Sequence, residues 1–227
     1  MFDALRAYPE AGKIITEVRE AGILPADIDN KELWFRNDIA QPLICLYQMM
    51  VWAVVKPLIP TPDIIAGYSI GEIGAYGVSG AVSPLETIRL ATLRGKLMSE
   101  AVDVPQTMVA VIGLHQGEIS RICERFGAYI AIVNAGNHFI IGLHEDQAEP
   151  FMQAAQEAGA GTVVHLELSV ASHTPFMAAA ATAFGQELAK TELSVSGGNI
   201  LAGINGEKVY TREQAVMALT TQIHQTI

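Results

Sequence analysis

A serine stands between two glycines in Gly67-Tyr68-Ser69-Ile70-Gly71, a G-x-S-x-G pattern. The apolar run 63–67 before it predicts a buried parallel strand, and residues 71–80 predict a helix rich in small residues. A sharp strand-to-helix turn strains the serine backbone and exposes its hydroxyl, the setting of a nucleophile in acyl transfer. The alternative is a tight turn with an inert serine.

A serine hydroxyl is a poor nucleophile until a base takes its proton, and histidine is the usual base near neutral pH. His173 is the candidate because it follows a predicted strand in 170–175, where a loop meets the start of a helix. Catalytic groups of α/β proteins commonly lie at such loop positions. A solvent-facing loop histidine is the alternative.

Arg94 is the third candidate, because its helical neighbours at i±3 and i±4 are Leu90, Ala91, Leu97 and Met98, all apolar. A guanidinium on an apolar face must meet an anion, since an unpaired buried charge is very costly. A protein carboxylate such as Glu72 would satisfy it, and so would a substrate carboxylate in the bidentate geometry that arginine favours. The pattern leaves both open.

Composition narrows the class of protein. The 227 residues carry 14 Lys+Arg and 24 Asp+Glu, a net charge of −10, and half are hydrophobic. Such a chain can bury a core without disulfides or metal, and it lacks the basic clusters of a nucleic-acid surface. Cys45 and Cys123 have no metal or redox spacing, which predicts buried free thiols.

A membrane span is not expected. The longest apolar run, 43–55, is shorter than the roughly 20 residues a span needs, so it predicts a buried core helix. No basic segment precedes an apolar stretch at the start, which predicts no secretory signal and cytoplasmic residence.

Alternating helices and strands must position these residues. Helices are expected near 11–21, from Asn37 or Asp38 to Pro57 with Pro42 in the first turn, from the Ser83 capping box to Glu100, from Thr174 to about Lys190, and from Arg212. Residues 106–168 change to the order β, α, β, β, α, β, a ferredoxin-like arrangement inserted into a larger α/β layer. We expect a small subdomain at 106–167 and a discontinuous large one at 1–105 and 168–227.

Three motifs in register, 67–72, 93–98 and 170–173, resemble the malonyl-CoA:acyl-carrier-protein transacylase family. The resemblance covers nearly the whole chain and implies an α/β-hydrolase-like parallel sheet layer with an inserted ferredoxin-like βαββαβ subdomain. Family members usually have histidine where this chain has Tyr68. That tyrosine, with 132–134, 170–175, 201–206 and 222–227, is most similar to the epsilon subunit of malonate decarboxylase.

The resemblance implies a role for each matched position. Ser69 would attack the thioester of malonyl-CoA, with His173 as general base and then general acid. The backbone N–H of Ile70 would be one oxyanion donor, the backbone carbonyl of Gln222 would orient His173, and Arg94 would bind the malonyl carboxylate. Asn134 would line the cleft between the subdomains.

The resemblance also implies partners. They are a CoA thioester substrate and the phosphopantetheine-type thiol of an acyl carrier protein, and this carrier would belong to a malonate decarboxylase complex. No bound cofactor, metal, nucleic acid or membrane is expected. Since the net charge is −10, docking an acidic carrier would need a local basic patch, for which Arg89, Lys96, Arg121 and Arg125 are the candidates.

Family members begin with a strand and a Gly-Gln-Gly turn that supplies a second oxyanion N–H, and they end with a further strand and a Gly-Pro-Gly turn. Neither matches a part of residues 1–227. One oxyanion donor is worth a factor of about 10² to 10³ in rate. Two alternatives therefore stand beside the transferase: a serine esterase or thioesterase, and a truncated non-catalytic domain that keeps a carrier-docking surface.

Overall fold

The computed structural model describes residues 2–24, 28–195 and 197–227, which fold into two compact units. The first unit comprises residues 1–96 and 184–220, and the second comprises 97–183 and 221–227. The second unit takes in more of the chain than the predicted 106–167. Its last residues hydrogen-bond along a strand of the module: Val133 N–H donates to Ile227 O at 2.8 Å, and Ile227 N–H donates to Ala131 O at 3.1 Å.

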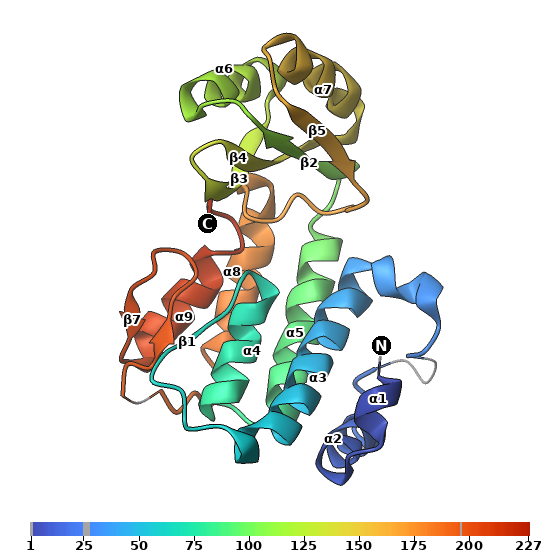
Figure 1. The fold of residues 1–227 in the computed structure, drawn as a ribbon, viewed down its shortest axis with the longest axis vertical. Helices are drawn as coiled ribbons and strands as arrows, with labels where there is room; N and C mark the ends of the chain where they lie inside the picture. Colours follow the sequence, from blue (N-terminus) through green and yellow to red (C-terminus); the bar gives the residue numbers. More distant parts are fainter. Residues whose placement is uncertain (1, 25–27, 196) are drawn as a thin grey trace. The chain divides into compact units, whose positions relative to one another are not determined.

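Helices dominate the first unit (Figure 1). They are α1 (Asp3–Arg6), α2 (Pro9–Glu20), η1 (Lys31–Phe35), α3 (Asn37–Val55), η2 (Lys56–Leu58), α4 (Ile70–Ser79) and α5 (Pro84–Glu100), with α8 (Ala178–Leu188) and α9 (Arg212–Thr221) later in the chain. The chain passes between the units within α5, α8 and α9.

Helix α3 is the core helix of the first unit and packs on α2 and α4. Its buried positions recur one turn apart, as at Gln41, Cys45 and Met49. The segment Asn37–Leu58 is long and apolar enough to cross a membrane, a test that the core helix of a soluble protein also passes. Pro42 lies inside the helix rather than in its first turn, because helical hydrogen bonding begins at Asn37.

Helix α5, which carries Arg94, begins as its sequence predicts. Pro84 occupies the first helical position, and the Ser83 hydroxyl accepts a hydrogen bond from the Glu86 N–H at 3.1 Å. The helix then continues to Glu100, where the sequence placed its end. Asn37 Nδ2 donates to Gly95 O at 2.9 Å, which fixes α5 against the start of α3.

A small sheet in the first unit joins β1 (Ile65–Ala66), β6 (Ile200–Leu201) and β7 (Lys208–Val209) in the order β1-β6-β7. Strands β1 and β6 are parallel, but β7 is antiparallel to β6. This corrects the expected all-parallel layer. Only a short turn joins β6 to β7, and a parallel pair would need a crossover of a dozen residues or more.

The second unit holds a four-stranded antiparallel sheet in the order β3-β4-β2-β5. Along the chain its elements are β2 (Gln106–Ile112), α6 (Gln116–Phe126), β3 (Tyr129–Ala135), β4 (His138–His144), η3 (Glu145–Gln147), α7 (Ala148–Glu157) and β5 (Thr162–Leu166), followed by η4 (Pro175–Met177). The predicted order β, α, β, β, α, β is therefore present, and it runs from Gln106 to Leu166, close to the predicted span 106–168.

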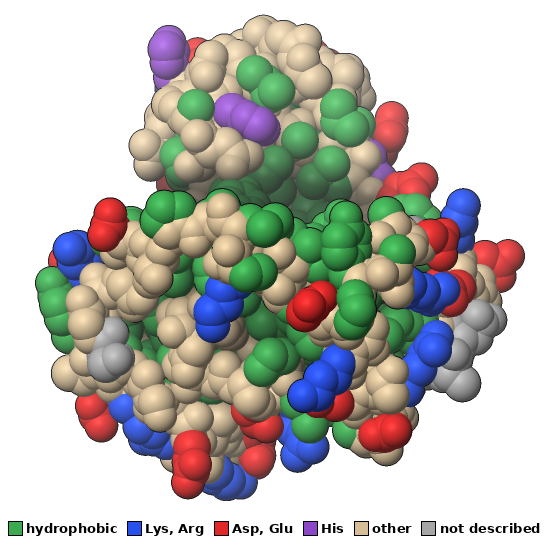
Figure 2. Space-filling view, turned by 60° about the horizontal axis from the view of Figure 1, so that its bottom comes forward, with side chains coloured by type: hydrophobic (Ala, Val, Ile, Leu, Met, Phe, Trp, Pro, Cys, Tyr) green, Lys and Arg blue, Asp and Glu red, His purple; other side chains and the backbone are tan. Residues whose placement is uncertain are grey.

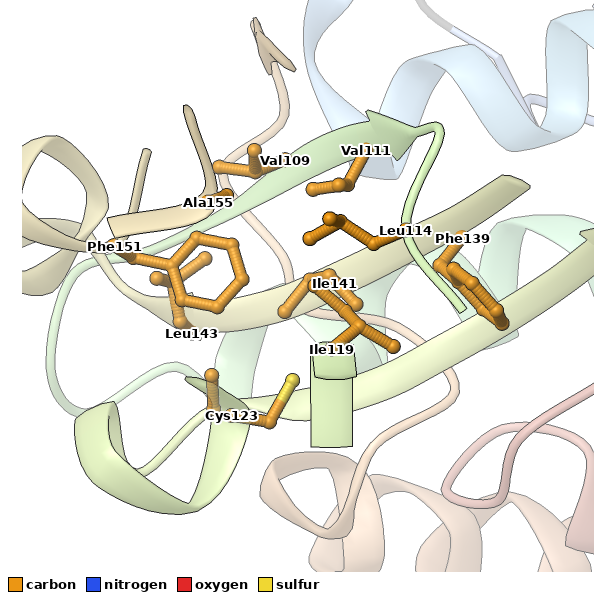
Figure 3. Close-up of a cluster of buried hydrophobic side chains, with 11 residues drawn as sticks. Val109, Val111, Leu114, Ile119, Cys123, Phe139, Ile141, Leu143, Phe151 and Ala155 are labelled. Atoms are coloured by element: carbon orange, nitrogen blue, oxygen red, sulfur yellow. The ribbon is translucent and has the colours of Figure 1, made fainter. Parts of the chain in front are cut away.

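Alternate residues of these strands make the core of the second unit. Val109 and Val111 of β2 and Ile141 of β4 face α6 and α7, where they meet Ile119 and Phe151 (Figure 3). The residues between them on the strands pack on the opposite face in a smaller cluster of Met108, Ala131, Ile132 and Ile140. Both faces of the sheet therefore carry buried apolar side chains.

Candidate active site

Ser69 lies at the turn between β1 and α4 with φ 53° and ψ −116°. Within the described residues, only Ser69 and His173 combine a side chain with positive φ. Gly67 makes the turn possible, because a Cβ on it would lie 2.1 Å from the carbonyl carbon and oxygen of Gly71. The strained serine is thus imposed by its surroundings, as in a nucleophile elbow.

The Gly67→Ala substitution should lower the free energy of unfolding by at least about 3 kcal/mol, because its methyl group meets rigid backbone. Gly117→Ala is the matched control, since a Cβ there meets nothing within 4 Å. Urea unfolding followed by circular dichroism measures both. Equal small changes in the two variants would show that the turn at Ser69 is not as tight as described.

The Ser69 hydroxyl does not cap its helix. Ser69 is the N-cap of α4 and Glu72 is the third helical residue, a spacing that would form a capping box. No side-chain cap hydrogen bond forms; the hydroxyl instead accepts a hydrogen bond from Arg94 Nη2 at 3.4 Å. The hydroxyl therefore faces the guanidinium rather than its own helix.

Arg94 is buried, with 1% of its surface exposed. Its Nη1 donates to Gln41 Oε1 at 2.6 Å, so the guanidinium is held between α3 and the Ser69 turn. Sequence reasoning missed Gln41. Asn37 and Asp38 lie one turn before it, so it reads as part of the polar start of α3 rather than as a polar residue on an apolar face.

Burial strongly shifts the pKa values of Arg94 and of the titratable groups around it. Burial lowers the pKa of Arg94 to about 10, opposed by Cys45 and Glu72, so the guanidinium stays charged at neutral pH. Burial raises the pKa of Glu72 to about 7, opposed by the Gly203 N–H and by Arg94. Burial also raises the pKa of the Cys45 thiol to about 12. Cys45 is therefore a neutral thiol here.

In the second unit, His173 is 1% exposed and has φ 61°. Its ring Nδ1 is hydrogen-bonded to the backbone carbonyl of Gln222, and the backbone N–H of His173 donates to Ile223 O at 2.8 Å. A carbonyl only accepts, so Nδ1 carries a proton, and in the neutral ring Nε2 is the nitrogen with the lone pair. The ring is oriented to act as a base through Nε2 without a carboxylate.

His173 also lines a cavity of about 700 Å³ within the second unit, together with residues of α6, the start of β3 and the chain end near His224. Asn134 lies elsewhere, on the exposed half of β3, where its Nδ2 is 3.4 Å from His138 Nε2. In the described ranges, no three His, Cys, Asp or Glu side chains gather so as to hold a metal ion.

Residues 13–216 match the acyl transferase domain family. The chain belongs to this family. The chain is 32% identical over 160 residues to the malonyl CoA-acyl carrier protein transacylase of Salmonella typhimurium, covering 68% of this chain and 52% of the relative. It is 35% identical over 134 residues to the Escherichia coli K12 protein of the same name, covering 57% and 43%.

Solved structures share the fold of this chain. A type II polyketide synthase malonyl-transacylase in complex with its acyl-carrier protein superposes with a TM-score of 0.91 at 25% identity, covering 99% of this chain and 76% of that one. The malonyl CoA-acyl carrier protein transacylase of Coxiella burnetii gives 0.87 at 26%, covering 96% and 74%. The chain spans about half the length of the curated relatives it matches first.

Proposed function

We propose that this protein transfers a malonyl group from malonyl-CoA to the thiol of an acyl carrier protein through a malonyl-Ser69 intermediate. The observation that carries the proposal is the contact between the strained Ser69 hydroxyl and the buried Arg94. A nucleophile and a carboxylate-binding cation at this distance select an acyl group with a carboxylate close to its thioester. Relatives named malonyl transacylases support the proposal.

The acylation step uses Ser69 and His173. The Ser69 oxygen bonds to the thioester carbon while His173 Nε2 takes the hydroxyl proton. The Gln222 carbonyl, hydrogen-bonded to Nδ1, stabilises the imidazolium that forms. Negative charge on the thioester oxygen is met by the Ile70 N–H, the first amide of α4, which the helix leaves without an internal acceptor.

The intermediate then collapses and the carbon–sulfur bond breaks. His173 returns its proton to the departing CoA sulfur, which leaves malonyl on Ser69. A carrier thiol next gives its proton to Nε2 and attacks the same carbon, and the Ser69 oxygen departs and takes that proton back as the hydroxyl. The first half-reaction forms the Ser69 ester and releases the CoA thiol, and the second consumes the carrier thiol to form its thioester and restores Ser69, so both balance without a further reactant.

Arg94→Met should separate malonyl transfer from acetyl transfer. Methionine keeps an unbranched stem but has neither the guanidinium nor its charge, so kcat/KM for malonyl-CoA should fall about 10²- to 10³-fold while that for acetyl-CoA changes less than about tenfold. Arg19→Met, at an exposed position of α2, is the control. Equal losses with both acyl groups would remove Arg94 from carboxylate binding.

A serine thioesterase would use the same nucleophile but give the acyl group to water. The test compares release of malonate without a carrier with radiolabelled malonyl transfer to a holo acyl carrier protein. We expect transfer to exceed hydrolysis by at least about tenfold, because His173 is buried and water would need to reach it. Dominant hydrolysis would favour the thioesterase, and carrier binding without transfer would favour a non-catalytic docking domain.

The finer assignment is a cytoplasmic subunit that loads the carrier protein of malonate decarboxylase, with Asn134 lining the cleft. It rests on Tyr68 and on the motifs that resemble the epsilon subunit. The antiparallel module at 106–167 is then the ferredoxin-like small subdomain, and 1–105 with 168–227 the large one. The carrier decides this assignment: faster malonyl transfer to the decarboxylase carrier than to a fatty-acid carrier supports it, and the reverse contradicts it.

The carrier would dock by local rather than overall charge. Lys and Arg side chains are interspersed with Asp and Glu on the face that Figure 2 shows. Among the basic candidates, Arg89 lies 3.8 Å from Glu86, whereas the Arg125 guanidinium stacks 5.0 Å from the Phe126 ring centre. Arg121 Nε donates to the backbone carbonyl of Gly117 at 3.1 Å, so the described contacts of Arg121 and Arg125 of α6 involve no carboxylate, and these two are the stronger candidates for binding an acidic partner.

A further inference from the structure

The loop that carries His173 lies on one face of the antiparallel sheet of the second unit, the face opposite α6 and α7. Side chains alternate along a strand, so every second residue of β2 and β4 belongs to this face. Four such residues meet the loop, namely Gln106 and Met108 of β2 and their paired residues His144 and Gly142 of β4. We call these four residues the loop platform.

Gly142 leaves the space that the loop occupies. A Cβ on Gly142 would lie 2.7 Å from Thr174 Cγ2 and 3.0 Å from the Cβ of Ala171. A side chain at this position would therefore lift the loop from the sheet. At the end of the same strand, the His144 ring lies 4.6 Å from the Phe176 ring, measured between ring centres. The loop is thus packed directly on the platform.

Gln106 binds the backbone of the loop. It is 4% exposed, and its Oε1 accepts a hydrogen bond from the Ala171 N–H at 3.1 Å, across 65 residues of chain. Ala171 is 0% exposed, so its N–H has no easy access to water as a substitute partner. The Ala171 carbonyl accepts a hydrogen bond from the Thr174 hydroxyl at 2.6 Å. Side chains therefore satisfy both backbone groups of this buried residue.

His173 follows two residues later with φ 61°, a conformation that is strained for any residue with a side chain. Such strain persists only where the surrounding contacts hold it. The His173 N–H donates to Ile223 O on one side of the strained residue, and Gln106 holds Ala171 on the other. Release of Ala171 would let the loop relax and turn the ring away from the Gln222 carbonyl.

Resting on the proposed function, we propose that Gln106 is a positioning residue for the general base His173. It acts through the backbone of Ala171. Its amide oxygen holds the loop in the strained conformation, and the loop holds the ring Nδ1 on the Gln222 carbonyl. Nε2 is then the ring nitrogen that takes up a proton. An apolar residue at 106 could fill the same space but could not accept the hydrogen bond.

NMR of the protein with isotope-labelled histidine tests this positioning without substrate. The Nδ1–H signal of His173 is assigned by its absence from His173→Ala. Methionine is similar in length to glutamine but offers no oxygen. In Gln106→Met we therefore expect the signal to shift and its proton to exchange with water at least about tenfold faster. Gln106→Glu, which keeps an oxygen acceptor at the same length, should retain the signal.

Thr107→Val is the matched control. It removes a buried hydroxyl from the next residue of β2, one whose contacts are His165 and Leu166 O rather than the loop. The signal of His173 should not change in this variant. A general loss of stability at the start of β2 would affect Gln106→Met and Thr107→Val alike.

Malonyl transfer to a holo carrier protein measures the consequence for the reaction. Gln106→Met should lower kcat about 10- to 100-fold and leave KM for malonyl-CoA within about threefold, because a misplaced base slows proton transfer without weakening binding. Gln106→Glu should restore kcat to within about fivefold of the unchanged protein. Thr107→Val should stay within about twofold.

The outcomes separate this inference from the proposed function. A Gln106→Met protein that keeps either its His173 signal or its kcat overturns the role of Gln106 and leaves malonyl transfer standing, as do equal losses in Gln106→Met and Thr107→Val. An unchanged protein that transfers no malonyl group overturns the proposed function, whereas the NMR comparison still decides whether Gln106 positions the ring. If Gln106→Met does not fold, Gln106→Asn replaces it in both measurements, since its amide is one methylene too short to reach the Ala171 N–H.

Discussion

Ser69→Ala should lower kcat for malonyl transfer by about 10⁴-fold or more, the largest effect of any single substitution in this protein. The change removes the oxygen that bonds to the thioester carbon, and no other hydroxyl is hydrogen-bonded to Arg94 among the described contacts. Transfer of radiolabelled malonyl groups to a holo carrier protein measures it.

Ser79→Ala is the matched control, since its hydroxyl lies at the other end of α4 and donates to Tyr76 O at 2.8 Å. It should lower activity less than about twofold. The Ser69→Ala variant should unfold at a urea concentration close to that of the unchanged protein, because the Ser69 hydroxyl makes no helix cap. A Ser69→Ala protein with a tenth or more of the activity would exclude covalent catalysis at this residue.

His173→Ala should lower kcat by about 10³- to 10⁴-fold, because it removes both the base of acylation and the acid that protonates the leaving thiol. The variant should also lose the decline of activity at low pH that protonation of the ring produces. The pH profile of kcat/KM distinguishes this role from a structural one, since a merely destabilised protein keeps the shape of the profile.

His165→Ala is the control for the second unit. His165 is bound to Thr107 Oγ1 at 3.0 Å and to Glu145 at 3.2 Å, and it is partly exposed. Its loss should leave both kcat and the pH profile within about twofold of the unchanged protein. If His173→Ala and His165→Ala lost activity equally, His173 would not be the general base.

Local signals predicted the elements that carry the site. The Ser83 cap and Pro84 define the start of α5, and helical spacing on that helix singled out Arg94 as a cation on an apolar face. The pattern of apolar and polar residues in 106–168 is clear enough to predict each strand and helix of the module. These features depend on neighbours within one or two turns, so the sequence displays them directly.

Non-local contacts could not be predicted from such patterns. The S-x-x-E spacing at Ser69 and Glu72 indicates a capping box. In the structure the Ser69 hydroxyl instead accepts a hydrogen bond from Arg94, and the Glu72 carboxylate accepts one from the Gly203 N–H. Gln41 binds Arg94 across 53 residues of chain, and β7 reverses direction through a two-strand hairpin. Each depends on which elements pack together, which periodicity does not encode.

Intact-mass spectrometry after brief mixing with malonyl-CoA tests the central claim most directly. The account predicts that the protein gains the mass of one malonyl group, that peptide mapping places it on Ser69, and that holo carrier protein removes it. Arg94→Met should lose this adduct and still form the acetyl adduct. An unchanged mass in a folded sample, or a malonyl group on another residue, would contradict malonyl transfer through Ser69.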